Sequence, residues 1–93
     1  MNILGKGHLI ILKHKNQGNI KLLIAVDKLI QDLESGKIGS AESLQKIRSD
    51  ADKVYNSGIY FFNIHIHRAL LIIEFNKLQA KVLWHERSLR LYI

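Results

Sequence analysis

The chain contains no cysteine and no proline among its 93 residues. Without cysteine it can form neither a disulfide framework nor a thiol nucleophile nor a cysteine-ligated metal site. The absence fits a reducing compartment, so a cytoplasmic location is expected. Because proline is missing, the ends of helices must depend on glycine and on polar capping residues.

Long apolar runs are missing as well. The only apolar run in the first fifteen residues, Leu9 to Leu12, is four residues long, which is too short for a secretory signal. No uninterrupted apolar stretch approaches the roughly 18 residues needed to cross a bilayer, so no membrane partner is expected.

Established catalytic and cofactor motifs are also absent. The sequence has no phosphate-binding P-loop, no glycine-rich dinucleotide turn, no His-Glu-x-x-His and no Gly-x-Ser-x-Gly. The pair Gly5 and Gly7 is too short a pattern to predict a phosphate loop. The expectation is therefore a protein without a cofactor.

Positive charge is present in excess, with a net charge of +6. Residues 1–26 carry four lysines and no acid, whereas residues 27–52 carry six acids and four bases. If the two basic ends of the chain meet in the fold, they form a positive surface around an acidic middle. Such a surface attracts phosphate or an acidic protein. A basic domain without such a partner has the same composition, and charge alone does not decide between the two.

The clearest predicted helix covers residues 20–34. Asn19 precedes it as a candidate N-cap, and Gly36 stands where a left-handed residue often ends a helix. The apolar residues of this segment recur with the spacing of one helix face: Leu22, Val26, Leu29, Ile30 and Leu33.

Shorter elements are predicted on both sides of this helix. Residues 2–4 read as a short strand, and residues 8–15 read as either a buried strand or a helical segment. A second helix is predicted from Ser40 to about Arg48, with Ser40 as its cap, and residues 49–52 follow as a loop.

From residue 59 onward, the composition shifts to β-branched and aromatic residues that favour strands. One strand over residues 59–75 would span about 56 Å at roughly 3.3 Å per residue. A chain of this length has a radius of gyration of only about 12 Å, so a turn is predicted near His65 and Ile66. A further strand is predicted from Leu78 to Trp84. The prediction is one α+β domain over residues 1–93, with N-terminal helices packed on a small, mostly antiparallel sheet.

The cluster from His65 to Arg68 is the densest set of reactive side chains. On a straight strand, His65 and His67 share one face and Arg68 has the other. The histidines could transfer protons, bind a metal or be solvated, but no third ligand accompanies them, so no metal site is predicted. Arg68 could hold a phosphate with two hydrogen bonds, or pair with Glu74 or Glu86.

Basic and aromatic residues gather again near the C-terminus: Lys81, His85, Arg87, Arg90 and Tyr92. Ribonuclease chemistry needs a base for the 2′-hydroxyl, a cation for the charged phosphorane and an acid for the leaving oxygen. Tyrosine, lysine, arginine and histidine side chains can supply these functions.

Four segments together resemble the HigB family of toxins from toxin–antitoxin pairs: Ser40–Leu44, Ser49–Val54, Tyr60–Ile64 and His67–Phe75. That family shows a short helix, a Ser-Ala-Asp-x-Val loop, a strand with Phe-Asn-Ile, a strand with arginine, and a final Thr-His-x-Glu-Tyr motif. The resemblance covers residues 40–93, and residues 1–39 only in outline. It implies a RelE-like fold and a ribosome-dependent mRNA endonuclease, with mRNA on the ribosome and a cognate antitoxin as partners.

The resemblance also implies a site. Its catalytic set is Arg68, His85, Tyr92 and His67, and its RNA-binding set is Lys81, Arg87, Arg90 and His65. The last motif departs from the family pattern, since Tyr92 keeps the tyrosine but Leu89 stands under the histidine. With a short deletion, His85 takes the place of that histidine. The alternative reading is a catalytically degenerate, toxin-like module that binds RNA or protein.

Overall fold

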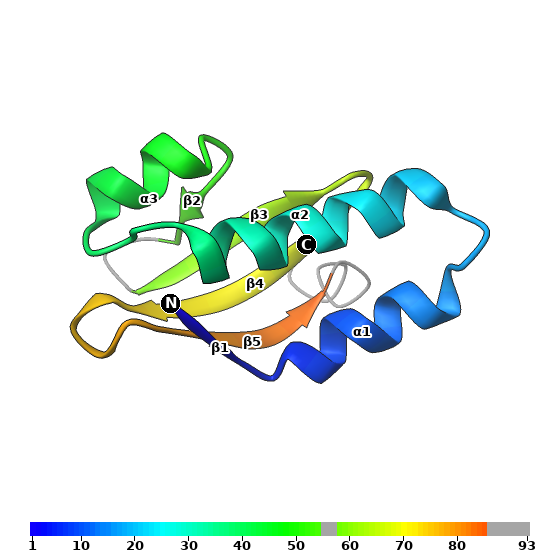
Figure 1. The fold of residues 1–93 in the computed structure, drawn as a ribbon, viewed down its shortest axis with the longest axis horizontal. Coiled ribbons are helices and arrows are strands. Elements are labelled where there is room, and N and C mark those ends of the chain that lie inside the picture. The colour runs from blue at the N-terminus through cyan, green and yellow to red at the C-terminus, as the bar shows by residue number, and fades with distance from the viewer. Residues whose placement is uncertain (55–57, 86–93) are drawn as a thin grey trace.

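The computed structural model describes residues 1–54 and 58–85. In chain order its elements are β1 (Asn2–Leu4), α1 (Lys6–Lys15), α2 (Ile20–Ser35), α3 (Ala41–Ile47), β2 (Asp52–Lys53), β3 (Ile59–Ile64), β4 (His67–Glu74), the 3₁₀ turn η1 (Phe75–Lys77) and β5 (Gln79–His85) (Figure 1). The predicted α+β class, with helices packed on a small sheet, is confirmed.

The strands form one mixed sheet in the order β1-β5-β4-β3-β2. The pairs β2–β3, β3–β4 and β4–β5 are antiparallel, whereas β1 runs parallel to β5 with Ile3 opposite Ala80. The start of the chain therefore lies beside the last described strand, so the described parts of the two basic ends of the sequence are adjacent.

Helix α2 follows its predicted boundaries closely. The Asn19 side chain accepts a hydrogen bond from the Leu22 amide at 3.1 Å, which confirms the predicted N-cap. The predicted left-handed residue at Gly36 is wrong, because its φ of −72° and ψ of 147° are extended. Glycine is needed there for close packing instead: a Cβ atom would lie 2.6 Å from the Asp32 carbonyl oxygen and 2.7 Å from Ile47 Cδ1.

The ambiguous segment over residues 8–15 belongs to helix α1. Its four consecutive apolar residues divide by helical period, since Leu9 and Leu12 are buried while Ile10 and Ile11 are exposed. A left-handed Gly5, with φ of 74°, makes the bend from β1 into this helix.

Helix α3 begins at a capping box. The Ser40 hydroxyl accepts a hydrogen bond from the Ser43 amide, and the Ser43 hydroxyl accepts one from the Ser40 amide. The prediction of Ser40 as the cap is confirmed.

The predicted turn inside the long apolar segment is a two-residue loop, His65–Ile66, between β3 and β4. Of these two residues His65 has the positive φ, 65°. A positive φ at the first loop residue is typical of a type II′ hairpin, whose twist matches that of the strands.

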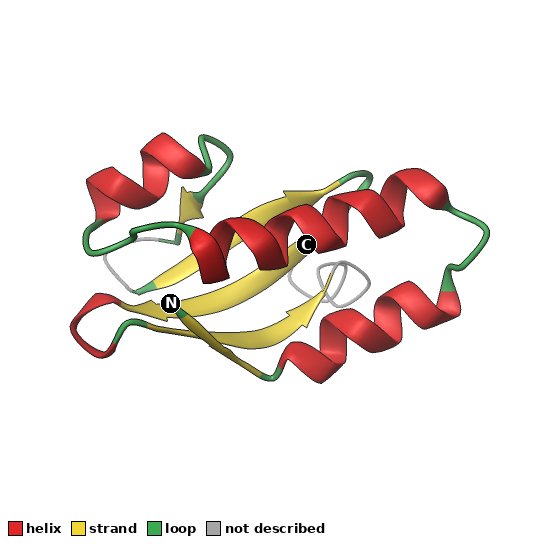
Figure 2. Ribbon diagram, viewed as in Figure 1, coloured by secondary structure: helices red, strands yellow, loops and turns green. Residues whose placement is uncertain are grey.

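The sheet has two unlike faces because side chains alternate along each strand. Helices α1 and α2 pack on the inner face, and Figure 2 shows α2 crossing in front of β3 and β4. The buried residues of the inner face are Tyr60, Phe62, Ile64, Ala69, Leu71, Ile73, Ala80 and Val82. On the outer face, Phe61, Arg68 and Ile72 are only partly buried, and Asn63 and Lys81 are exposed.

Within the described ranges, none of the helices has the length and apolar character needed to cross a membrane.

Candidate functional site

Arg68 lies on the outer face of the sheet, in β4. The strand register places it opposite Asn63 of β3 and diagonal to Phe61. Its guanidinium carbon sits 4.4 Å from the centre of the Phe61 ring, which is a cation–π contact. The ring contact favours an orientation in which the guanidinium lies against the outer face of the sheet.

Among the described residues, one carboxylate lies near Arg68. Its terminal nitrogen lies 3.4 Å from Asp52 in β2, and the Arg68 and Asp52 side chains are 37% and 68% exposed. Ion pairs this exposed contribute little free energy, so another anion can replace the Asp52 carboxylate at small cost. The Nε atom of Arg68 is enclosed, which leaves the two terminal nitrogens for a ligand. Two terminal nitrogens of one guanidinium can hold two oxygens of a phosphate.

Lys81 shares this face. It lies in β5 opposite Ile72, which is four residues along β4 from Arg68, so with the spacing between the strands the backbone positions of Arg68 and Lys81 are roughly 14 Å apart. Lys81 is exposed and makes no ion pair with any other described residue. We call Arg68, Phe61 and Lys81 the outer-face cluster; its chemistry suits an extended phosphate-bearing ligand.

The two histidines near Arg68 do not join it on the outer face. His65 is exposed in the hairpin loop. His67 pairs in register with Ile64, so it belongs to the inner side of the sheet, opposite to Arg68. His67 and Arg68 therefore lie on opposite faces of the sheet, as predicted. His65 lies in the loop before β4, so it does not share a strand face with His67.

The remaining predicted site residues are at the end of the chain. The backbone of His85 is the last of β5 and pairs with Ala69, whereas its side chain is not described. Arg87, Arg90 and Tyr92 lie outside the described residues. The described structure thus places Arg68, Lys81, His65 and His67, and brings only Arg68 and Lys81 to the same face.

Arg48 is a buried arginine that the sequence reasoning did not single out. It follows α3, its side chain is 9% exposed, and its two terminal nitrogens reach Asp32 at 3.3 Å and Asp50 at 2.7 Å. The second nitrogen also donates to the Asn63 carbonyl at 2.8 Å. The sequence did contain a signal for this role: Arg48 directly follows a predicted helix, and Asp50 comes two residues later.

The hydrogen bonds of Arg48 and Asp50 also fix the backbone of β3 next to the outer-face cluster. The Asp50 oxygen that binds Arg48 also accepts a hydrogen bond from the Asn63 amide at 2.7 Å. Both polar backbone groups of Asn63, the residue opposite Arg68, are thereby fixed. Arg48 is accordingly a positioning residue that joins α2, α3 and β3.

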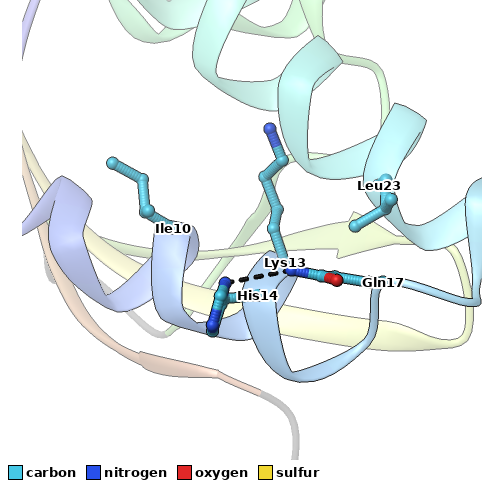
Figure 3. Close-up of a pocket in the computed structure, with 5 residues that line it drawn as sticks. All are labelled: Ile10, Lys13, His14, Gln17 and Leu23. Atoms are coloured by element: carbon cyan, nitrogen blue, oxygen red, sulfur yellow. Dashed lines mark hydrogen bonds between the residues drawn. The ribbon is translucent and has the colours of Figure 1, made fainter.

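A separate hollow of about 240 Å³ lies between α1 and α2, away from the sheet. It is lined by Ile10, Lys13, His14, Gln17 and Leu23 (Figure 3). Nδ1 of His14 lies 3.1 Å from the Gln17 side-chain nitrogen, and Lys13 pairs with Asp27 across the two helices.

No set of three metal-binding side chains is found among the described histidines and carboxylates. No family model matches the chain, and no curated protein matches it. The likeness to HigB toxins therefore rests on the segments quoted above.

Proposed function

We propose that this chain is the toxin of a toxin–antitoxin pair, acting in the cytoplasm as a ribosome-dependent mRNA endonuclease of the HigB type. The observation that supports this best is the outer-face cluster, in which an oriented guanidinium lies on a phenyl ring with a weakly held carboxylate beside it. The arginine of the HigB strand motif and the arginine of this cluster are the same residue, Arg68.

RNA cleavage needs three functions around one phosphate. A base removes the 2′-hydroxyl proton, the oxygen attacks phosphorus, and an acid protonates the departing 5′ oxygen. Arg68 is assigned to the negative charge that gathers on the phosphorane oxygens. Proton transfer is assigned to His85, or to His65 or His67, on the strength of the resemblance; in the strand register His85 and His67 pair with the inner-face residues Ala69 and Ile64. Tyr92 borders the site on the strength of the resemblance.

Substrate binding is assigned to Lys81 on the same face as Arg68 and, on the strength of the resemblance, to other basic residues. Lys81 holds the backbone of the RNA beside Arg68, with Arg87, Arg90 and His65 as further contacts. The ribosome presents the mRNA, and the cognate antitoxin neutralises the toxin.

The test is induced expression without an antitoxin, with mRNA ends mapped in the presence of ribosomes. The wild-type chain should stop growth and create new mRNA ends. Arg68→Ala should lower cleavage on the order of 10²–10³-fold, because it removes a transition-state cation, while circular dichroism shows it folded. Lys46→Ala, at an exposed α3 position, is the matched control and should cleave normally. Harmless expression of folded wild-type chain without new ends would overturn the nuclease assignment.

The second candidate is a toxin-like module that binds RNA without cutting it. Leu89 in the position of the motif histidine favours this function. It predicts salt-dependent RNA binding that Arg68→Ala weakens, with no new mRNA ends from the wild-type chain.

A further inference from the structure

Asp52 stands beside Arg68 on the outer face of the sheet. In the register of β2 and β3, Asp52 is opposite Phe61, and residues opposite each other on antiparallel strands have their side chains on the same face. An oxygen of Asp52 lies 3.4 Å from a terminal nitrogen of Arg68. Among the described carboxylates, that of Asp52 alone is within ion-pair distance of Arg68. A phosphate held by Arg68 therefore lies next to this carboxylate.

Hydrogen bonds fix the backbone that leads into Asp52. The Asp50 carboxylate accepts one from the Arg48 guanidinium and one from the Asn63 amide, each at 2.7 Å. The Ala51 amide donates to the Arg48 carbonyl at 3.0 Å, and Asp52 then joins the ladder with β3. The Asp52 side chain is 68% exposed, so a ligand reaches a carboxylate that extends from a fixed backbone. Such support is what a reacting group needs to keep its geometry.

The described side chains around Arg68 include one proton acceptor with the strength of a general base. Arg68 and Lys81 carry hydrogen-bond donors and no acceptor. His65 is in the hairpin loop, and His67 belongs to the inner side of the sheet. A carboxylate takes protons from hydroxyl groups in general base catalysis, and here that carboxylate belongs to Asp52.

We propose that Asp52 is the general base of the RNA cleavage, an inference that rests on the proposed nuclease function. The scissile phosphate binds the terminal nitrogens of Arg68, and the Asp52 carboxylate takes the proton of the adjacent 2′-hydroxyl. The 2′ oxygen then forms a bond to phosphorus while the bond from phosphorus to the 5′ oxygen breaks. A protonated histidine or a water molecule gives the departing oxygen its proton, and Asp52 returns its own proton to solvent. The products are a 2′,3′-cyclic phosphate and a 5′-hydroxyl end.

Asp52 has opposite effects on binding and on the reaction in this scheme. Its negative charge lies close to the phosphate and competes with it for Arg68, so the carboxylate opposes RNA binding. The same carboxylate promotes the reaction, because without it the 2′-hydroxyl keeps its proton. A residue that acted only in folding or in substrate binding would change cleavage and binding in the same direction.

The test measures cleavage and binding separately on the full chain. Single-turnover cleavage is followed by mapping mRNA ends on programmed ribosomes. Binding is followed by fluorescence anisotropy of a labelled RNA oligonucleotide with methylated 2′-hydroxyls, which cannot be cut. Asp52→Asn should cleave on the order of 10²-fold more slowly or worse, and should bind the oligonucleotide at least as tightly as the wild type.

Two further variants complete the comparison. Asp52→Glu should recover part of the rate, since it returns a carboxylate to the same position. Glu42→Gln removes an exposed acid from α3 and is the matched control, which should cleave at the wild-type rate. All three should remain folded by circular dichroism, because the Asp52 ion pair is exposed and contributes little stability.

Wild-type cleavage by Asp52→Asn would overturn the proposal, and faster cleavage with tighter binding would show Asp52 to be only a competitor for Arg68. Parallel losses of cleavage and binding would assign Asp52 to substrate binding and overturn it as well. In each of these cases an active wild type and an inactive Arg68→Ala would leave the nuclease function standing. A wild-type chain that creates no mRNA ends would overturn both proposals, so the two failures are distinguishable.

Discussion

Arg48 and Arg68 show how one residue type takes opposite roles in this fold. Arg48 is enclosed and its terminal nitrogens bind Asp32, Asp50 and the Asn63 carbonyl. Arg68 is partly exposed, rests on Phe61 and, among the described residues, pairs with one exposed carboxylate, that of Asp52. The first arrangement holds three elements together, whereas the second leaves a charge that a ligand can use.

Replacing Arg48 by alanine should lower the free energy of unfolding by roughly 3 kcal/mol, since two partly buried carboxylates lose their cation. Arg68→Ala is the matched control and should cost less than about 1 kcal/mol, because its ion pair is exposed. Urea denaturation followed by circular dichroism measures both. Equal losses for the two variants would contradict the assignment of Arg48 as the structural arginine.

At the scale of elements, the β3–β4 hairpin carries local strain at a known residue. His65 has a φ of 65°, in the left-handed region, which costs a residue with a side chain about 1 kcal/mol or more. Ile66 does not have a positive φ. The sequence reasoning placed the turn correctly, near His65 and Ile66. A turn without glycine or asparagine gives no local signal of which residue adopts the positive φ.

His65→Gly should therefore leave the protein as stable as the wild type or up to about 1 kcal/mol more stable, because relief of strain offsets the entropy that glycine adds to the unfolded chain. Ile66→Gly, one residue along the same loop, should lower stability by roughly 0.5–1 kcal/mol, since it adds the entropy without relieving strain. Thermal unfolding of both variants decides the point. A destabilised His65→Gly would show that the His65 side chain stabilises the loop.

The elements predicted well from sequence are those with a periodic pattern and a polar cap. Helix α2 and its Asn19 cap belong to this group. Segment 8–15 stayed ambiguous because four adjacent apolar residues fit a strand or a helix equally. The parallel contact of β1 with β5 was not predictable, since it joins residues nearly eighty positions apart. On the outer face, Arg68 was found from its residue type and motif, whereas its support by Arg48 depends on tertiary contacts.

The Asn19 cap gives a quantitative check on α2. Asn19→Ala removes the acceptor of the Leu22 amide and should cost about 1 kcal/mol of stability. Gln31→Ala, at an exposed position inside the same helix, should change stability by less than a few tenths of a kcal/mol. Equal melting temperatures for the two variants would contradict the capping role.

At the scale of the whole molecule, ion pairs neutralise the acidic middle of the chain. Among the described acids, Glu42 alone makes no ion pair, and several pairs join segments far apart, such as Lys6 with Glu34 and Arg68 with Asp52. The excess charge consequently lies on lysines that make no ion pair with described residues: Lys15, Lys21, Lys37, Lys46, Lys53 and Lys81. Of these, Lys81 belongs to the outer-face cluster.

This distribution predicts how RNA binding responds to salt. If the outer-face cluster contacts phosphates, affinity for a single-stranded RNA oligonucleotide should fall linearly on a double-logarithmic plot against salt concentration. Each phosphate contact contributes about 0.7 to the slope, so Arg68→Gln with Lys81→Gln should reduce the slope by about 1.4. Lys46→Gln removes one equal charge from α3 and should lower affinity only slightly, with the slope unchanged. A slope that falls for Lys46→Gln but not for the double variant would place the RNA on the α3 side of the molecule, away from Arg68.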